Sequence, residues 1–278
     1  MRLALCALLW VICLEISGAR ANVVLPGCTG TIFIMPGMAD EQNALVVTNG
    51  HCLNIGDYEW QGGRYLSPGQ FLFNHDLDNT GYSATVFSAR GVNGKTYAAR
   101  RIIFGTITAT DLAIIELNVN YSILKKSGYR VFAIARNLPK TGMRLDFSSY
   151  NESFDGTCKV HGIVPTVVEG PYVWTNVVKM ELNKKCRVYP GVSGTPGILK
   201  STNEIYAIGN TEYTGEGKEC EIMNPCERDA SSGTLRHGPP TQTYAIPTAP
   251  LYDCYDTTSS RFDFNMTSCK LKNADAVH

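Results

Sequence analysis

The sequence carries little charge and shows no excess of either sign. Its 278 residues contain 25 lysines and arginines against 25 aspartates and glutamates, so the formal net charge is zero. No basic stripe runs along the chain, which argues against nucleic acid as the main partner. Internal repeats, low-complexity tracts and long stretches of helical periodicity are also missing. These absences favour one large domain or two small ones, built mainly from short strands.

Long apolar runs are absent except at the start of the chain. The segment from Leu3 to Leu14 is apolar, the chain turns polar by Gly18, and Ala19-Arg20-Ala21 follows as a cleavage site. A membrane span needs about 20 apolar residues, so this shorter pattern favours a secretory signal peptide over an anchoring helix. We therefore predict a signal peptide at residues 1–21, a mature start at Asn22, and a secreted, extracellular product.

Closely spaced cysteine pairs of the C-x-x-C type are missing as well. Cys6 and Cys13 would leave with the signal peptide, and an even set would remain in an oxidising compartment. That set is Cys28, Cys52, Cys158, Cys186, Cys220, Cys226, Cys254 and Cys269. Because the histidines do not cluster with these cysteines, the pattern predicts structural disulfides rather than a metal site. We expect neither a metal nor another cofactor.

The chain does contain a series of short segments rich in Val, Ile, Thr and aromatic residues, split by Gly, Pro, Asn and Asp. Examples are residues 30–35, 44–48, 101–104, 111–117, 159–164 and 174–182. This pattern is typical of an all-β sandwich or barrel. One helix is expected near the end, over Pro247 to Tyr255, and one long loop over Thr214 to Gln242.

The strand pattern weakens between Ala135 and Asp155. We expect two β-subdomains on either side of this break, over residues 22–140 and 141–256, with a cleft between them. A C-terminal extension would follow at residues 257–278. A mature chain of this size is long enough to bury a substantial core.

One serine lies between two glycines in Gly191-Val192-Ser193-Gly194-Thr195-Pro196. Glycines permit a tight turn that projects the hydroxyl outward and lets nearby N–H groups converge on a developing oxyanion. Acyl transfer needs this combination of a nucleophile and preorganised donors. The G-x-S-x-G pattern also marks α/β-hydrolases, but that fold requires strands alternating with helices and a histidine after the serine.

His51 ends the apolar segment "ALVVTNGHCL" and is followed at once by Cys52. A serine hydroxyl needs a base near neutral pH, and an imidazole can supply one. Cys28 lies in a matching context earlier in the chain, so a Cys28–Cys52 disulfide would fix the turn that carries His51. The alternative is a core histidine with no chemical role.

Asp111 begins the strongly apolar segment "DLAIIEL". A carboxylate at such a boundary is unfavourable to bury without a partner, and an imidazole N–H would serve as one. Asp111 would then hold His51 in the tautomer that accepts a proton. An ordinary aspartate at the start of a strand is the alternative.

Taken together, "VVTNGHC", "TDLAIIEL" and "YPGVSGTPGI" occur in the order of the chymotrypsin/trypsin-like serine peptidase family, which the sequence resembles from Asn22 to about Asp256. The resemblance implies two six-stranded antiparallel β-barrels with a short C-terminal helix. It also implies a serine endopeptidase in which Ser193 attacks the scissile carbonyl and His51 transfers the proton. Asp111 would orient the imidazole, and the N–H groups of Gly191 and Ser193 would form the oxyanion hole.

Two features depart from the digestive members of that family. Val192 stands where those enzymes have an aspartate that pairs with a new N-terminus, so we expect removal of the signal peptide alone to give the active form. The resemblance places the substrate pocket at Arg187, Tyr189, Gly209, Asn210 and Thr211. Arg187 at the base of this pocket does not support a trypsin-like preference at P1. An acidic P1 preference and an arginine that points to solvent are the alternatives.

Cys158 is expected to pair with Cys186, which leads into the nucleophile turn. The last four cysteines allow three connectivities, of which Cys220–Cys226 with Cys254–Cys269 closes short loops. Three N-x-S/T sequons mark Asn120, Asn151 and Asn265 as candidate glycosylation sites.

Two further hypotheses stand beside the secreted serine endopeptidase. One is a catalytically silent homologue that binds a partner protein outside the cell, and the other is an adhesive or lectin-like β-domain. The presence of all three triad residue types favours the enzyme. We expect a monomer whose partners are protein or peptide substrates and protein inhibitors, with neither nucleic acid nor a membrane.

Overall fold

The computed structural model describes residues 23–55, 58–60, 63–78, 80–87, 94–149, 155–183, 186–188 and 191–272. The predicted signal peptide and the mature start at Asn22 lie outside these residues. Within them, no helix is long and apolar enough to cross a membrane.

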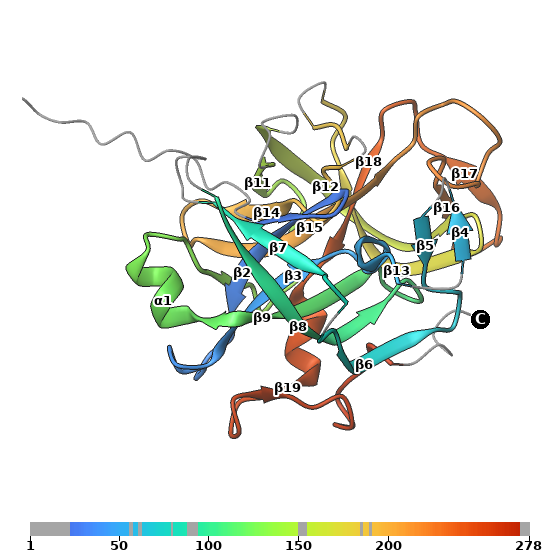
Figure 1. Ribbon diagram of the computed structural model, residues 1–278. Coiled ribbons are helices and arrows are strands. Elements are labelled where there is room, and N and C mark those ends of the chain that lie inside the picture. The colour runs from blue at the N-terminus through green and yellow to red at the C-terminus, as the bar shows by residue number, and fades with distance from the viewer. Residues whose placement is uncertain are drawn as a thin grey trace, which may run out of the picture.

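Six antiparallel strands close into a first barrel (Figure 1). The ring runs β1–β2–β3–β9–β8–β7 and returns to β1. Its strands are β1 (Val23–Leu25), β2 (Cys28–Ile34), β3 (Asn43–Thr48), β7 (Ser83–Val86), β8 (Lys95–Thr106) and β9 (Leu112–Asn120). Val46, Phe104 and Ile114 on neighbouring strands are fully buried and belong to the core of this half.

Six further strands close into a second barrel, in the order β11–β12–β13–β18–β15–β14 and back to β11. They are β11 (Arg144–Ser148), β12 (Asp155–Glu169), β13 (Tyr172–Met180), β14 (Pro196–Leu199), β15 (Glu204–Glu212) and β18 (Thr243–Pro247). A separate apolar cluster that includes Phe147, Val160 and Val178 packs in this half. The predicted all-β fold with two six-stranded barrels is therefore confirmed.

One short strand joins the two barrels. β10 (Phe132–Ile134) pairs in parallel with β2 of the first barrel and with β15 of the second. The predicted boundary at residue 140 falls in the connection between β10 and β11. As a limit between two domains it stays a prediction.

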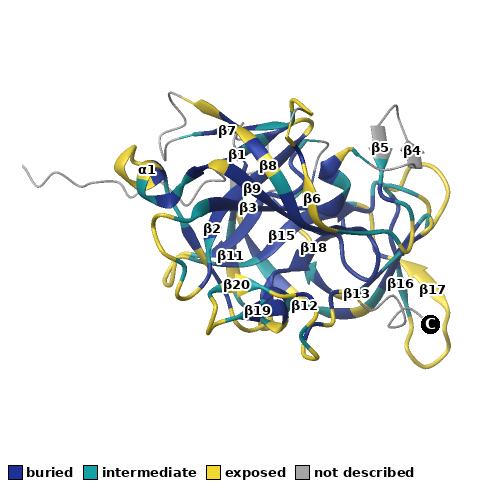
Figure 2. Ribbon diagram, turned by 60° about the horizontal axis from the view of Figure 1, so that its bottom comes forward, coloured by how far each residue is buried: buried dark blue, intermediate teal, exposed yellow. Residues whose placement is uncertain are grey.

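The remaining elements surround the barrels. They are β4 (Tyr58–Trp60), β5 (Gly63–Tyr65), β6 (Phe71–Asp76), β16 (Cys226–Arg228), β17 (Leu235–His237), β19 (Tyr255–Asp256), β20 (Arg261–Phe262), the α-helix α1 (Tyr121–Lys126) and the 3-10 helices η1 (Gly50–Leu53) and η2 (Ala249–Cys254). Figure 2 shows buried residues along β3, β9 and β15, and exposed ones in β17.

Two local predictions need correction, and one helix was missed. The expected C-terminal helix is the six-residue 3-10 helix η2, shorter than Pro247 to Tyr255 and with a proline in its first turn. The expected loop at 214–242 contains the β16–β17 hairpin. The helix α1 was not predicted, because six residues are too few to show a period of 3.6. It begins where the Asn120 side chain accepts a hydrogen bond from the N–H of Ile123 (2.9 Å).

The described residues form four disulfides, and all four join the pairs suggested by the sequence. They are Cys28–Cys52, Cys158–Cys186, Cys220–Cys226 and Cys254–Cys269. Among the sequons, Asn265 is exposed and Asn120 caps α1, whereas Asn151 lies outside the described residues.

The C-terminal extension folds back onto the first barrel. Just before the extension, the Tyr255 hydroxyl donates a hydrogen bond to the carbonyl of Pro36 (2.7 Å). Phe262 packs edge-on against Phe33, and Phe264 stacks on Phe104, with ring centroids 6.4 and 5.0 Å apart. The extension therefore covers part of the first barrel's core.

Candidate active site

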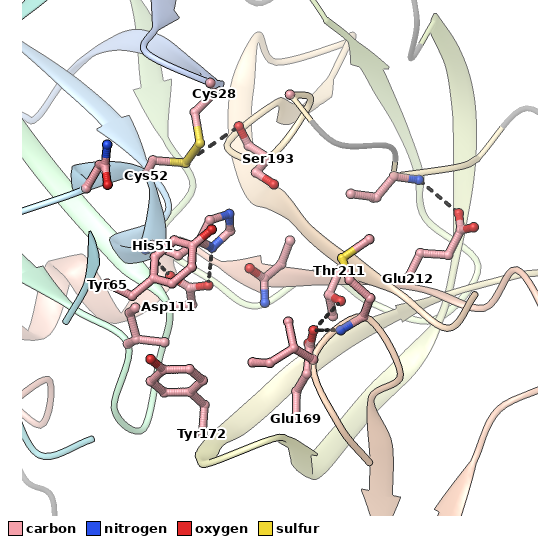
Figure 3. Close-up of a pocket in the computed structure, with 18 of the residues that line it drawn as sticks. Cys28, His51, Cys52, Tyr65, Asp111, Glu169, Tyr172, Ser193, Thr211 and Glu212 are labelled. Carbon is pink, nitrogen blue, oxygen red and sulfur yellow. Dashed lines mark hydrogen bonds and ion pairs between the residues drawn. A yellow bond between two sulfur atoms is a disulfide. The ribbon is translucent and has the colours of Figure 1, made fainter. Parts of the chain in front are cut away.

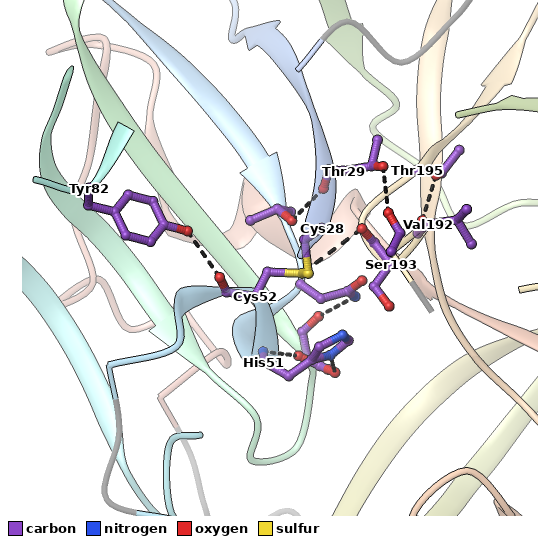
Figure 4. The surroundings of a disulfide bond; sticks show 12 residues. Cys28, Thr29, His51, Cys52, Tyr82, Val192, Ser193 and Thr195 are labelled. Carbon is purple, nitrogen blue, oxygen red and sulfur yellow. Dashed lines mark hydrogen bonds and ion pairs between the residues drawn. A yellow bond between two sulfur atoms is a disulfide. The ribbon is translucent and has the colours of Figure 1, made fainter. Parts of the chain in front are cut away.

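His51 is held in the tight 3-10 turn η1, directly after β3. At Gly50 a side chain would place its Cβ 1.9 Å from the carbonyl oxygen of Thr106, so only glycine fits. The Cys28–Cys52 disulfide ties the same turn to β2, and the Tyr82 hydroxyl donates to the Cys52 carbonyl (3.0 Å; Figure 4). These contacts fix the backbone next to the imidazole.

Asp111 is fully buried and contacts His51 twice. Its Oδ2 lies 2.6 Å from His51 Nδ1, and its Oδ1 accepts the backbone N–H of His51 (2.9 Å). A carboxylate facing Nδ1 requires the proton on that nitrogen, which leaves Nε2 as the acceptor. The arrangement therefore sets both the tautomer and the orientation of the ring.

The electrostatics of His51 follow from this contact. Burial alone would lower the pKa of the imidazole, but the charge and hydrogen bond of Asp111 outweigh it, with a smaller contribution from the charge of Glu169. The net result is a His51 pKa above the ordinary 6.5. The ring is consequently suited to accepting a proton and holding it as imidazolium.

Ser193 lies on a loop that is anchored in both barrels. Val192, before it, is fully buried in the apolar cluster of the second barrel. From β2, the N–H of Thr29 donates to the Ser193 carbonyl (2.8 Å) and the Thr29 hydroxyl to the Gly191 carbonyl (3.0 Å; Figure 4). At Gly194 a Cβ would lie 2.0 Å from the carbonyl oxygen of Thr29, which excludes any other residue.

The same contacts leave donors available at the nucleophile. The carbonyls of Gly191 and Ser193 are bonded to Thr29, and that of Val192 accepts from the N–H of Thr195 (3.0 Å). Among the described residues, nothing accepts the N–H groups of Gly191 or Ser193. An oxyanion hole needs two such preorganised, unengaged N–H groups.

A cavity of about 350 Å³ brings the three predicted catalytic residues together. His51, Asp111 and Ser193 all line it, and Figures 3 and 4 show the Ser193 side chain near the His51 ring. Ser193 and His51 are both described, and no hydrogen bond joins their side chains. Catalytic hydrogen bonds are often long without substrate and shorten in the complex, so this geometry is compatible with proton transfer.

The predicted pocket residues divide into three groups. Asn210 and Thr211 line the cavity, Arg187 and Gly209 do not, and Tyr189 lies outside the described residues. Gly209 instead bonds through its backbone to Gly194 and Thr195.

Arg187 is engaged with a buried carboxylate. Its Nε donates to both carboxylate oxygens of Glu212 (2.7 Å each), and its Nη2 lies 2.5 Å from Oε1. The Glu212 side chain is 1 % exposed and also accepts the N–H of Val188 (3.0 Å). Because Glu212 neutralises Arg187, the cation offers no unpaired charge to an acidic P1 residue.

Several cavity residues were not predicted from the sequence. They are Tyr65, Glu169, Tyr172, Trp174, Ile222 and Met223. Most lie near the ends of hairpins or just before β16. Their local sequence resembles that of other hairpins, so no signal distinguishes them before the barrels are assembled.

Glu169 has the most perturbed carboxyl group in the cavity. It is 4 % exposed, and burial raises its pKa to about 7, against the opposing effect of hydrogen bonds from Met223 and Thr211 and of the charge of His51. A carboxyl whose pKa is raised in the folded protein stabilises the folded state less when it is ionised than when it is protonated. Its contribution is complete below the ordinary pKa of 4.5 and is lost as the pH rises through about 7.

We expect Glu169→Gln to remove this pH dependence of stability. Between pH 4.5 and 8 the free energy of unfolding of the variant should rise relative to wild type by about 3 kcal/mol, because each unit of pKa shift corresponds to roughly 1.4 kcal/mol. Urea denaturation with the disulfides intact measures it at both pH values. Parallel pH curves for the two proteins would contradict the assignment.

One group of described side chains has metal-ligand spacing: Cys28, His51 and Cys52 lie with their donor atoms within 4.8 Å of one another. Both sulfurs belong to a disulfide. Since thiolates are the ligands that metals need, this group does not fit a metal ion.

The two closed barrels, with the cavity lined from both, define a serine protease fold of the chymotrypsin-like kind. No protein-family model matches the sequence, and no curated protein sequence matches it. Solved structures that are similar to this chain include proteases.

Three examples illustrate the similarity. The MamO protease domain from Magnetospirillum magneticum is 12 % identical, with a TM-score of 0.49 over 85 % of this chain and 96 % of that one. The Nocardiopsis protease NAPase is 12 % identical, with a TM-score of 0.46 over 88 % and 97 %. Mouse neuropsin, a serine protease, is 13 % identical, with a TM-score of 0.43 over 83 % and 90 %. Because these values are low, we base the function on the geometry of the site.

Proposed function

We propose that this protein is a secreted serine endopeptidase that cleaves peptide bonds through an acyl-enzyme intermediate. The observation that carries the proposal is the His51–Asp111 contact of 2.6 Å in the cavity that also holds Ser193. A core histidine or a strand-start aspartate would not require a serine side chain near the ring. An adhesive β-domain would not require the three side chains to meet.

The chemistry follows from the positions of the protons. His51 Nε2 takes the hydrogen of Ser193 Oγ as that oxygen attacks the scissile carbonyl, and the N–H groups of Gly191 and Ser193 bind the resulting oxyanion. His51 then gives the proton to the leaving amine, and water repeats the sequence to release the acid. General-base catalysis contributes about 10²–10⁴ in rate and one oxyanion donor about 10²–10³.

The cavity, the disulfides and Val192 support the proposed substrate class, extracellular location and activation. A cleft at the surface, lined by both barrels, suits an extended protein or peptide chain. Four disulfides fit an extracellular protein. Val192, fully buried among apolar side chains, supports an enzyme that does not need an aspartate at that position for activation.

A fluorophosphonate probe tests the proposal. We expect the wild-type protein to be labelled at Ser193, with the modified peptide identified by mass spectrometry, and to degrade casein. Ser193→Ala should show neither reaction while keeping its fold. A correctly folded wild-type protein that is not labelled and does not cleave casein would indicate the alternative, a catalytically silent homologue that binds a partner protein.

A further inference from the structure

The cavity holds a buried carboxylate that the proposed mechanism does not use. Glu169, the last residue of β12, accepts hydrogen bonds at Oε1 from the N–H of Met223 (2.7 Å) and the hydroxyl of Thr211 (3.1 Å; Figure 3). Its other oxygen, Oε2, is buried and has no partner among the described residues. Buried polar atoms are almost always paired, so an unpaired acceptor in a cavity wall indicates a donor supplied by a ligand.

A second unpaired group lines the same cavity. Asn210 on β15 is 4 % exposed, and neither Oδ1 nor Nδ2 has a partner among the described residues. An amide can turn its oxygen toward a donor. The cavity therefore offers at least two buried acceptors.

The charges around the cavity are unevenly matched. Asp111 contacts His51, and Glu212 is neutralised by Arg187. Among the described lining residues, Glu169 is the carboxylate without a cation in contact. A buried carboxylate of this kind is matched best by a positive charge that carries its own N–H donors.

The walls near Glu169 suit a long, partly apolar side chain. They include Tyr172, Trp174, Ile222 and Met223. The two aromatic residues use their polar tips elsewhere: Trp174 Nε1 donates to the Ile107 carbonyl (2.9 Å), and the Tyr172 hydroxyl donates to the Leu66 carbonyl (3.1 Å). Carbon surface is left to contact the methylene stem of an arginine or lysine.

We propose that this wall is a subsite for a cationic side chain of the substrate, arginine or lysine, with Glu169 as the residue that determines the preference and Asn210 as a second acceptor. The inference rests on the proposed peptidase function. It differs from a trypsin-like P1 preference, because the acid acts from the β12–β13 turn and not from the segment at 187–189, where the resemblance places the base of the P1 pocket.

The ionisable groups around Glu169 make the preference depend on pH. Those that share the cavity are His51, Tyr65, Asp111, Tyr172 and Glu212. On neighbouring elements, Lys218 pairs with Glu221, Glu219 with His237, and Lys179 of β13 with Glu227 of β16. Burial raises the pKa of Glu169 to about 7, so the carboxyl is largely neutral in acid and attracts a cation more strongly as the pH rises.

Peptides that contain arginine or the neutral isostere citrulline test the preference. Each of the four positions on either side of the scissile bond is varied in turn. At one position outside P1 we expect kcat/KM to be about 10- to 100-fold higher for arginine at pH 8.5, the range for hydrogen bonds to a charged group. Equal values at every position outside P1 would overturn the inference.

Glu169→Gln assigns the effect to one residue. The variant should lose the arginine advantage while cleaving the citrulline peptide within about threefold of wild type. Glu116→Gln is the matched control, because Glu116 is also buried (5 % exposed) but pairs with Arg100 and Arg101 away from the cavity. It should keep the full arginine advantage. Retention of that advantage in Glu169→Gln would overturn the assignment.

The pH dependence of the arginine preference can be tested in the wild-type protein without a variant. The titration of His51 affects both peptides equally and cancels in the ratio of their kcat/KM values. For a group that titrates near pH 7, the ionised fraction rises by about 30-fold between pH 5.5 and 8.5, and the arginine-to-citrulline ratio should rise with it. If the arginine-to-citrulline ratio does not change with pH while the probe still labels Ser193, the inference is overturned and the proposed function stands. Without labelling or cleavage of any peptide, the proposed function fails and the inference fails with it.

Discussion

Ser193→Ala and His51→Ala are each expected to lower kcat for peptide hydrolysis by about 10⁶-fold, the loss found when a serine nucleophile or its base is removed. In the proposed mechanism Ser193 supplies the attacking oxygen and His51 acts as its base, and both residues line the cavity. Without either one, the remaining group cannot form the acyl-enzyme. Steady-state hydrolysis of a chromogenic peptide by each purified variant gives the values.

The double variant separates a joint mechanism from two independent effects. Ser193→Ala/His51→Ala should be no slower than either single variant, since the two residues act in one step. Additive losses, or a His51→Ala protein within tenfold of wild type, would contradict the assignment of His51 as the base. Thermal unfolding confirms that each variant is folded.

Asp111→Asn is expected to lower kcat by about 10⁴-fold, because the amide places the histidine proton on the wrong nitrogen. Asp111 accepts both the backbone N–H and the ring Nδ1–H of His51. An asparagine has one acceptor oxygen, and its NH₂ group, when turned to the ring, would make Nδ1 the acceptor and leave Nε2 protonated. Peptide hydrolysis measures the loss.

The same variant has a second readout in the pH profile. Asp111 raises the pKa of His51 against the effect of burial. Removing the negative charge should therefore move the midpoint of the rise in kcat/KM to lower pH. Glu116→Gln, outside the cavity, should leave both the rate and the midpoint unchanged. An Asp111→Asn protein with wild-type activity would show that the carboxylate does not orient the base.

The candidate catalytic residues could be found in the sequence because each lies in a short motif with its own local constraint. Gly50 and Gly194 are required by backbone contacts next to His51 and Ser193. Cys52 ties the histidine turn to β2. The short apolar segments likewise predict the strands of the barrels, because the burial pattern of a strand can be recognised in a few consecutive residues.

The walls of the cavity could not be found in this way. Glu169 becomes a cavity residue only when β12 and β15 bring it to Thr211, 42 positions away. The resemblance places Arg187 at the pocket, but its partner Glu212 lies 25 residues further on. Charge pairing over such separations depends on barrel closure, which no local pattern encodes.

The C-terminal extension has a consequence for the resistance of the fold to proteolysis. Residues 257–259 form exposed turns between Cys254 and Cys269, where a peptidase can cut. A single cut there leaves the tail attached through the disulfide, with Phe262 and Phe264 still beside Phe33 and Phe104. The fold is thereby tolerant of a proteolytic cut in this segment.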